Sequence, residues 1–277
     1  MTPDSSTAPN VVGDALDIDA IRRQLWPDGL GGRLYLYVEV PSTNVILREL
    51  ARAGAAEGTV VLAESQTAGR GRGGQPWFSP PGMNLYASVL LRPEIPPRAV
   101  PVLSFIASLA LADTIDEQGL RAAIKWPNDI LVKGKKVAGA LAEVAAAGDH
   151  VEFLILGVGV NLNVERGAFL AALGPAGRAA SSLKELLGQP IDRNAFAATF
   201  LNYLGQWLAI YREQGEAPIL RAWRDRDILT GARVEVREEA RVFDGRVRGV
   251  DPDGCLEVAD SLGRLHRVVA GEIRLVE

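Results

Sequence analysis

Short stretches rich in apolar, β-branched and aromatic residues recur along the first 160 residues of the chain, separated by polar and glycine-containing segments. Stretches of this length and composition are typical of β-strands. Two longer stretches, at 45–54 and 98–118, carry apolar residues at helical spacing instead. The pattern therefore predicts a mixed β-sheet with helices packed against it. The predicted strands cover residues 33–40, 59–64, 84–91, 121–126, 129–133, 136–145 and 151–160.

The pattern changes twice in the second half of the chain. From Ser181 to about Arg226 it turns helical, with aromatic residues spaced for one stripe that faces the core. After Asp227 it becomes short alternating strands separated by Asp-Gly turns, which predicts a small β-barrel-like domain. We therefore predict an α+β protein in three parts: a flexible N-terminal tail at 1–19, a main domain at 20–227 and a β-domain at 228–277.

Composition narrows the classes of protein to which the chain can belong. Its formal net charge of −4 and pI near 5.4 argue against a protein built mainly to coat nucleic acid. A single cysteine, Cys255, excludes an intramolecular disulfide framework and a cysteine metal cluster. No apolar run reaches the roughly 18 residues of a membrane-spanning helix, and the N-terminus lacks the pattern of a signal peptide. These features predict a cytoplasmic protein that binds neither a membrane nor nucleic acid.

The segment from Gln66 to Trp77 follows a predicted strand and places Arg70 and Arg72 among four glycines. Arginine offers a permanently charged fork that suits carboxylates and phosphates, and glycine lets the backbone approach a ligand closely. The segment is not a Walker A loop, because no Gly-Lys-Ser/Thr follows. A Gly-Arg tract could also be a linker or bind RNA, but such tracts are usually long and repetitive. We expect a loop that is ordered by an anionic ligand.

Three further polar groups follow predicted strands, and their convergence there favours a ligand pocket. Ser42-Thr43-Asn44 offers hydroxyls and an amide at a helix start, and Gly157-Val-Gly-Val-Asn161 ends an apolar strand with glycines that allow backbone approach. The third group is Lys125-Trp-Pro-Asn-Asp129. The chain has 25 arginines but only five lysines, and four of those lysines lie between positions 125 and 136. Each group alone could be a helix cap or a tight turn, but together they favour one binding site.

Taken jointly, these motifs resemble those of biotin–protein ligases. The resemblance implies the biotin–lipoate ligase catalytic fold, which is similar to class II aminoacyl-tRNA synthetases, over 20–227, and an SH3-like β-barrel over 228–277. It implies an ATP-dependent enzyme that forms biotinyl-5′-AMP and transfers biotin to a lysine of a biotin carboxyl carrier protein domain, in acetyl-CoA carboxylase or a related carboxylase, with Mg²⁺ accompanying ATP. The resemblance rests on GRGRGGQPWFSPPGMNLY at 69–86, KWPND at 125–129, GKKVAGALAE at 134–143, GVGVNLN at 157–163 and AGEIR at 270–274.

The resemblance also assigns candidate site residues by their positions within these motifs. As candidate catalytic residues, Lys136 would bridge the biotin carboxylate and the α-phosphate, Arg72 would hold phosphate oxygens, and Asp129 would orient or deprotonate the incoming lysine amine. Trp77 would stack near adenine. No pattern identifies metal ligands. The implied biotin-binding residues are Ser42, Thr43, Asn44, Gln66, Gly69, Arg70, Gly71, Arg72, Lys136 and Gly139. The implied ATP- and adenylate-binding residues are Arg70, Arg72, Trp77, Lys125, Asn128, Lys136 and Asn161.

Two features distinguish the chain within the family that it resembles. Gly73 and Gln75 stand where many members carry further basic residues, so loop closure would rest mainly on Arg70 and Arg72. Only about 40 residues precede Ser42, too few for the winged helix-turn-helix domain of the repressor branch, so we expect a ligase without repressor activity. A lipoate–protein ligase is one alternative, although that family lacks this loop and the KWPND motif, and a biotin-responsive regulatory protein is another. A homodimer formed through a sheet edge is compatible with the sequence.

Overall fold

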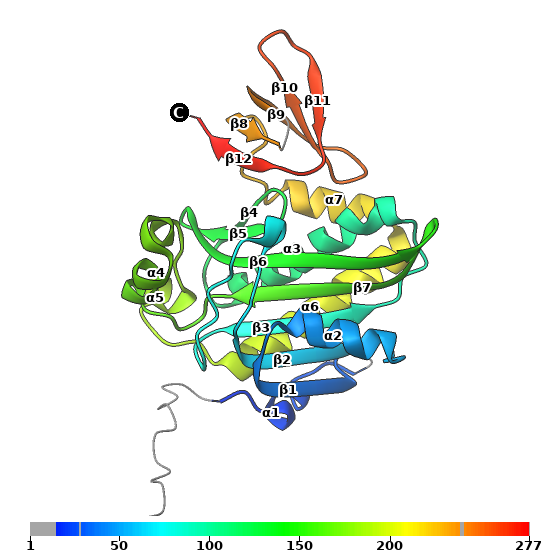
Figure 1. Ribbon diagram of the computed structural model, residues 1–277, viewed down its shortest axis with the longest axis vertical. Coiled ribbons are helices and arrows are strands. Elements are labelled where there is room, and N and C mark those ends of the chain that lie inside the picture. The colour runs from blue at the N-terminus through cyan, green and yellow to red at the C-terminus, as the bar shows by residue number, and fades with distance from the viewer. Residues whose placement is uncertain (1–14, 28, 239–240, 277) are drawn as a thin grey trace, which may run out of the picture.

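The computed structural model describes residues 15–27, 29–238 and 241–276, and within these ranges the larger part of the chain forms a seven-stranded mixed sheet (Figure 1). The strand order is β1-β2-β3-β7-β6-β5-β4, in which β1 pairs with β2 in parallel and the other neighbours pair antiparallel. The predicted mixed sheet is therefore confirmed. Its strands are β1 (Arg33–Val40), β2 (Thr59–Gln66), β3 (Leu85–Leu91), β4 (Ala122–Lys125), β5 (Asp129–Val132), β6 (Lys135–Ala147) and β7 (His150–Val160).

Helices cover both faces of this sheet (Figure 1). One face packs against α2 through a small apolar cluster that includes Leu47, Leu90 and Ile155, and the other packs against α3 and α6 in the main core. Because β3 is covered on both faces, all of its residues are buried. The helices are α1 (Ile18–Arg22), α2 (Thr43–Arg52), α3 (Val100–Glu117), α4 (Arg166–Leu173), α5 (Leu183–Leu187), α6 (Arg193–Gln214) and α7 (Glu216–Arg224), with 3₁₀ turns at Arg72–Gly74, Pro97–Ala99 and Gly174–Ala179.

The apolar character of α3 corrects one expectation from the sequence. With its preceding turn it spans Pro97–Glu117, and among the described residues it is a helix long and apolar enough to cross a membrane by length and composition alone. This segment was not recognised as one long apolar run in the sequence, because Ser104, Ser108 and Thr114 interrupt it. The structure buries 67% of the most apolar window inside the protein. Packing in the core therefore accounts for the composition of this helix.

The N-terminal segment is ordered earlier than the sequence suggested. Of the expected flexible tail at 1–19, residues 1–14 lie outside the described residues. Leu16, however, is buried, and its N–H donates to Glu64 Oε1 at 2.7 Å. Asp17 caps α1, and its own N–H donates to Asn194 Oδ1 at 2.8 Å. The side chains of β2 and α6 thus fix the chain from residue 15 onwards.

A second sheet follows α7, and within the described residues it has five short antiparallel strands in the order β11-β10-β9-β8-β12. The alternating segments that the sequence marked after Asp227 are these strands, so a small C-terminal β-domain is consistent with the structure. The pairing of β10 with β9 shifts register between Glu257 and Val258. The strands are β8 (Arg233–Arg237), β9 (Val242–Val250), β10 (Leu256–Ala259), β11 (Leu265–Val268) and β12 (Glu272–Leu275).

Two hydrogen bonds between side chains and backbone join the C-terminal sheet to the rest of the protein. Trp126, in the loop between β4 and β5, donates from Nε1 to the carbonyl of Gly254 at 3.0 Å. Arg224 at the end of α7 donates to the carbonyl of Val250 at 2.8 Å. Trp126 is 3% exposed. The KWPND motif therefore connects the two sheets.

Replacing Trp126 with phenylalanine is expected to lower the free energy of unfolding by about 1–3 kcal/mol, because the buried carbonyl of Gly254 loses its donor. Urea denaturation measures this change. Trp26→Phe is the matched control, since Trp26 is exposed and a surface exchange of this kind changes stability by about 0.5 kcal/mol or less. Equal stabilities of the two variants would show that the Trp126–Gly254 bond does not hold the sheets together.

Candidate active site

A large cavity of about 1270 Å³ lies between the seven-stranded sheet and the C-terminal sheet. Its wall includes residues from each of the sequence motifs named above, which range from the segment after β1 to the last strand, β12. The sequence-predicted site residues that line it are Ser42, Thr43, Asn44, Gln66, Arg70, Gly71, Arg72, Trp77, Asn128, Asp129, Lys136 and Gly139.

Three predicted site residues do not line this cavity: Gly69, Lys125 and Asn161. A Cβ at Gly69 would lie 2.6 Å from Ser79 Oγ, so this glycine lets the base of the loop pack closely. Asn161 is buried and donates from Nδ2 to the carbonyl of Ser181 at 3.2 Å. Its amide joins the end of β7 to the segment before α5, which is a structural role. Lys125 ends β4 outside the cavity wall.

One end of the cavity is a polar pocket built on the start of α2. Gln66 Oε1 accepts from the N–H of Thr43 at 3.0 Å and lies 3.3 Å from the Thr43 hydroxyl. Ser88, on β3, places its hydroxyl 2.7 Å from Thr43 Oγ1 and 2.6 Å from Asn44 Oδ1. Gln66 Nε2 in turn donates to Ser79 Oγ at 3.1 Å. Hydroxyls and amides here form a fixed hydrogen-bonding surface that suits a polar, uncharged ligand group.

Two glycines of β7 make room for side chains of this site. A Cβ at Gly157 would approach Cγ of Asn44 to 2.8 Å, and a Cβ at Gly159 would approach Cε2 of Trp77 to 2.5 Å. From the sequence, we expected these glycines to let a ligand approach the backbone closely. In the structure, the amide and the indole occupy that space instead. Gly157 and Gly159 therefore form the floor under Asn44 and Trp77.

Lys136 and Arg72 bring positive charge to the wall of the cavity. Lys136 Nζ lies 2.6 Å from Asp129 Oδ1 and 5.3 Å from the centre of the Trp77 ring. Arg72 places its guanidinium 5.6 Å from the centre of the Trp126 ring. Burial lowers the pKa of Arg72 and the nearby Asp129 carboxylate opposes that change, but an arginine stays charged at neutral pH. Lys136 and Arg72 thus both line the cavity near Asp129, an arrangement that favours binding of an anion.

The loop that carries Arg70 and Arg72 folds back on itself as a short hairpin. Arg70 and Pro76 form an isolated β-bridge, and the N–H of Gly71 donates to the carbonyl of Gln75 at 2.7 Å. Gly73 has a φ of 61° at the turn, a conformation that glycine adopts without strain. The hairpin holds both arginines at the cavity, and its tip is exposed.

Two groups of residues at this site were not found from the sequence. The first group supports the polar pocket from behind and consists of Ser79, Ser88, Glu143 and Arg48. Ser79 and Glu143 stand within the motifs at 69–86 and 134–143, but no site role was expected for them. The C-terminal sheet forms the far wall of the cavity. Its contributions are Arg237, Glu238, Arg241, Val269, Ala270, Gly271, Glu272 and Arg274.

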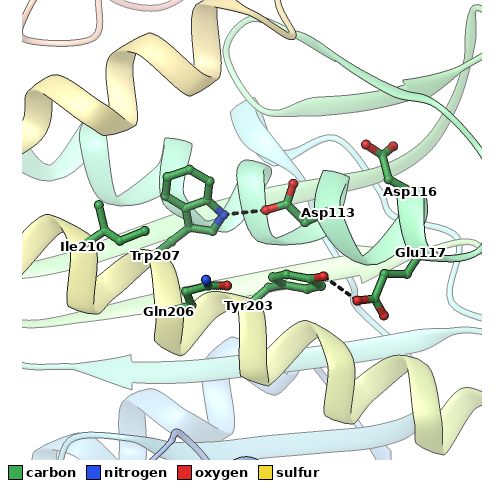
Figure 2. A pocket seen from close by; sticks show the side chains of 7 residues that line it. All are labelled: Asp113, Asp116, Glu117, Tyr203, Gln206, Trp207 and Ile210. Atoms are coloured by element: carbon green, nitrogen blue, oxygen red, sulfur yellow. Dashed lines mark hydrogen bonds between the residues drawn. The ribbon is translucent and has the colours of Figure 1, made fainter.

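A second, smaller cavity of about 510 Å³ lies between α3 and α6 (Figure 2). It is lined by carboxylates and aromatic rings, but these side chains bond to one another. Trp207 donates to Asp113 at 2.7 Å, and Tyr203 donates to Glu117. Arg226 pairs with Asp113 at 2.6 Å and with Asp116 at 2.8 Å. Because the carboxylates of this cavity already have partners, we place the active site in the larger cavity.

Comparisons with known proteins show to which family the chain is related. The profile of the biotin/lipoate A/B protein ligase family matches residues 36–161. The bifunctional ligase/repressor BirA of Bacillus subtilis is 34% identical over 256 residues, which cover 92% of this chain and 78% of that protein. The biotin–[acetyl-CoA-carboxylase] ligase of Mycobacterium tuberculosis is 35% identical, with 93% of this chain and 95% of that protein covered. The structure of the biotin protein ligase from Aquifex aeolicus in complex with biotin and ATP superposes with a TM-score of 0.74 at 26% identity, covering 88% of this chain and 99% of that one.

Proposed function

The chain belongs to the biotin–protein ligases, and on this premise we propose that it activates biotin with ATP as biotinyl-5′-AMP and transfers the biotinyl group to a lysine of a carboxyl carrier protein domain. The relatives include biotin–[acetyl-CoA-carboxylase] ligases, and one similar structure holds both biotin and ATP. The main support for the proposal is that one cavity contains both an uncharged polar pocket and a pair of cations. That combination fits a ligand with a polar ring at one end and a carboxylate at the other.

In the first step, a carboxylate oxygen of biotin attacks the α-phosphorus of ATP, and pyrophosphate leaves. Two anions must approach each other, so fixed positive charge is needed to offset their repulsion and to stabilise the charge that develops at phosphorus. Lys136 and Arg72 supply this charge at the wall of the cavity. We assign Lys136 to the biotin carboxylate and the α-phosphate together, and Arg72 to the phosphate oxygens, with Arg70 and Gly71 of the same hairpin closing over the product.

The polar pocket is assigned to the ureido ring of biotin. Ser42, Thr43, Asn44 and Gln66 present donors and acceptors there. Gly139 and the apolar wall beside it would face the rest of biotin. Trp77 and Asn128 are assigned to the adenine side, although Asn128 already donates from Nδ2 to the carbonyl of Ala140. Lys125 and Asn161, which stand outside the cavity, are not assigned direct contacts.

Mg²⁺ accompanies ATP, and the residues of the cavity fit a metal that is carried by the nucleotide. Among the residues that the structure describes, there is no group of three or more His, Cys, Asp or Glu side chains that could hold a metal ion. Mg²⁺ commonly binds through substrate phosphates and water with one or two carboxylates, and Asp129 and Glu272 line the cavity. When bound, the ion would neutralise phosphate charge.

In the second step, the lysine amine of the carrier attacks the acyl carbon of biotinyl-5′-AMP, an amide bond forms, and AMP leaves. The amine must lose a proton, and Asp129 is the carboxylate beside Lys136 at this point of the cavity. We therefore assign Asp129 to orienting or deprotonating the incoming amine.

Asp129→Asn is expected to slow transfer from preformed biotinyl-5′-AMP to the carrier by about 100-fold, because an amide cannot accept the proton. Adenylate formation should fall by less than about tenfold, since both cations remain. Single-turnover assays separate the two rates. Asp149→Asn, at the exposed turn between β6 and β7, is the matched control. An equal loss in both steps would show that Asp129 acts only by holding Lys136.

The overall activity is tested with the purified protein, ATP, Mg²⁺, biotin and a carrier domain, followed by streptavidin detection of the carrier. We expect labelling that requires ATP, biotin and the acceptor lysine. Omission of ATP and replacement of biotin by lipoate are the controls. A carrier that stays unlabelled with biotin and is lipoylated instead would favour a lipoate–protein ligase.

The finer architecture is proposed on the same basis. We place the domain boundary near residue 227 and regard the five strands from β8 to β12, the described part of the C-terminal unit, as an SH3-like barrel. Short antiparallel strands and the register shift between Glu257 and Val258 support this assignment. Limited proteolysis should cut between α7 and β8 first. Cleavage inside the strands would argue against a separate domain.

We propose a cytoplasmic enzyme that binds no nucleic acid and can associate through the edge strand β1. The net charge of −4 supports the absence of a nucleic-acid partner. On β1, Val38 is 82% exposed, and its strand has a neighbour on one side only within the described sheet. Light scattering tests for a dimer, gel-shift assays test for DNA binding, and cell fractionation tests the location.

A further inference from the structure

Glu143, on β6, lies behind the polar pocket and contacts side chains from two other segments of the chain. Its Oε2 accepts from Asn44 Nδ2 at 2.8 Å and lies 3.1 Å from an Arg48 guanidinium nitrogen. Its Oε1 lies 3.7 Å from an Arg70 guanidinium nitrogen. The Glu143 side chain is 18% exposed and is not part of the cavity wall. One carboxylate thus connects α2, the arginine hairpin and the sheet.

The carboxylate of Glu143 determines which way the Asn44 amide faces. A carboxylate can only accept hydrogen bonds, so the NH₂ group of Asn44 must point towards Glu143. The amide oxygen then faces the Ser88 hydroxyl at 2.6 Å. Gly157 lies directly against the amide, and because it has no side chain, it leaves room for the amide in this position. The orientation of Asn44 is therefore set from both ends.

Arg48 lies one helical turn after Asn44, so both side chains project from the same face of α2 towards Glu143. Arg48 offsets the charge of Glu143 in this half-buried place. Arg70 is 45% exposed and reaches the same carboxylate from the hairpin. Glu143 is thus the common partner of the polar pocket and of the loop that borders it.

We propose that Glu143 is a positioning residue for recognition of the polar ring of the substrate, acting through Asn44. The proposal rests on the proposed function, because it concerns the pocket assigned to the ureido group of biotin. Glu143 itself touches neither substrate nor reacting atoms.

The test is Glu143→Gln, which keeps the shape of the side chain and removes its charge. We expect the KM for biotin to rise about 10- to 100-fold, as a lost charge-assisted hydrogen bond implies, while the KM for ATP stays within about twofold. In an Asn44→Ala background, Glu143→Gln should add less than about threefold, because the group that it orients is gone. Glu152→Gln, an exposed position on the neighbouring strand β7, is the matched control.

Ser88→Ala, which acts on the other end of the same amide, is the second variant if Glu143→Gln does not fold. It should also raise the KM for biotin selectively. The proposal is overturned if the KM for biotin changes by less than about twofold, if both KM values rise together, or if the effect persists in full without Asn44. A wild-type protein that fails to use biotin at all would refute the proposed function instead, so the two failures are distinguishable.

Discussion

Lys136→Ala is expected to lower the rate of biotin-dependent exchange between ATP and pyrophosphate by about 100-fold or more, the scale of losing one preorganised charge at a developing anion. Lys136 lines the cavity with its ammonium group 2.6 Å from Asp129. Without it, the Asp129 carboxylate would face the two reacting anions without its salt-bridge partner. Arg72→Ala should act in the same direction. The exchange assay isolates adenylate formation, because it needs no carrier.

Lys135→Ala is the matched control for this prediction. Lys135 is the adjacent residue of β6, but it is exposed, and its ammonium donates to the carbonyl of Arg178 outside the cavity. Its removal should leave the exchange rate within about twofold, as expected for a surface position away from the site. Circular dichroism should show that both variants are folded. Normal exchange in Lys136→Ala would refute the assignment of this lysine to the first step.

Gly157→Ala is expected to raise the KM for biotin by about 100-fold or to abolish detectable use of biotin, which corresponds to a loss of roughly 3 kcal/mol. The added methyl group would overlap the Asn44 amide, whose Cγ would be only 2.8 Å away. Asn44 must then leave its place between Glu143 and Ser88, and the polar pocket loses its shape. Isothermal titration with biotin alone measures the effect without any catalytic step.

The control for Gly157→Ala is Gly167→Ala, on α4, where nothing lies within 4 Å of the added Cβ. Since alanine favours a helix over glycine, this variant should be at least as stable as the wild type and should bind biotin normally. If Gly157→Ala bound biotin like the wild type, the pocket at Asn44 would not be the biotin site.

Local patterns predicted the elements of this fold well because each strand and helix is encoded by its own residues. The strand expected at 129–133 is β5, and that expected at 151–160 is β7 with one more residue at its start. Such local patterns do not predict the order of the strands, because β3 pairs with β7 across some 60 residues that include α3. The ordered start at Leu16 was also missed, because Glu64 and Asn194, far away in sequence, hold it.

Site residues that lie within contiguous motifs were predicted from the sequence. Those whose role depends on partners far away along the chain were missed. The hairpin arginines were expected at an anion because of their charge and their glycine-rich loop, and Lys136 was assigned by the resemblance to biotin–protein ligases. Glu143 was overlooked because its partners Asn44 and Arg48 are about 100 residues away. Asn161, at the end of a strand, was assigned to the adenylate by the resemblance, but its amide donates to the carbonyl of Ser181. A polar residue at a strand end is therefore ambiguous until its long-range partners are known.

The most direct test of the account is exchange of labelled pyrophosphate into ATP by the wild-type protein with no carrier present. The account predicts exchange that requires biotin, because the polar pocket and the two cations bring the biotin carboxylate to the α-phosphate within one cavity. Exchange that proceeds equally without biotin, or carrier labelling without any exchange, would contradict an acyl-adenylate formed at Lys136 and Arg72.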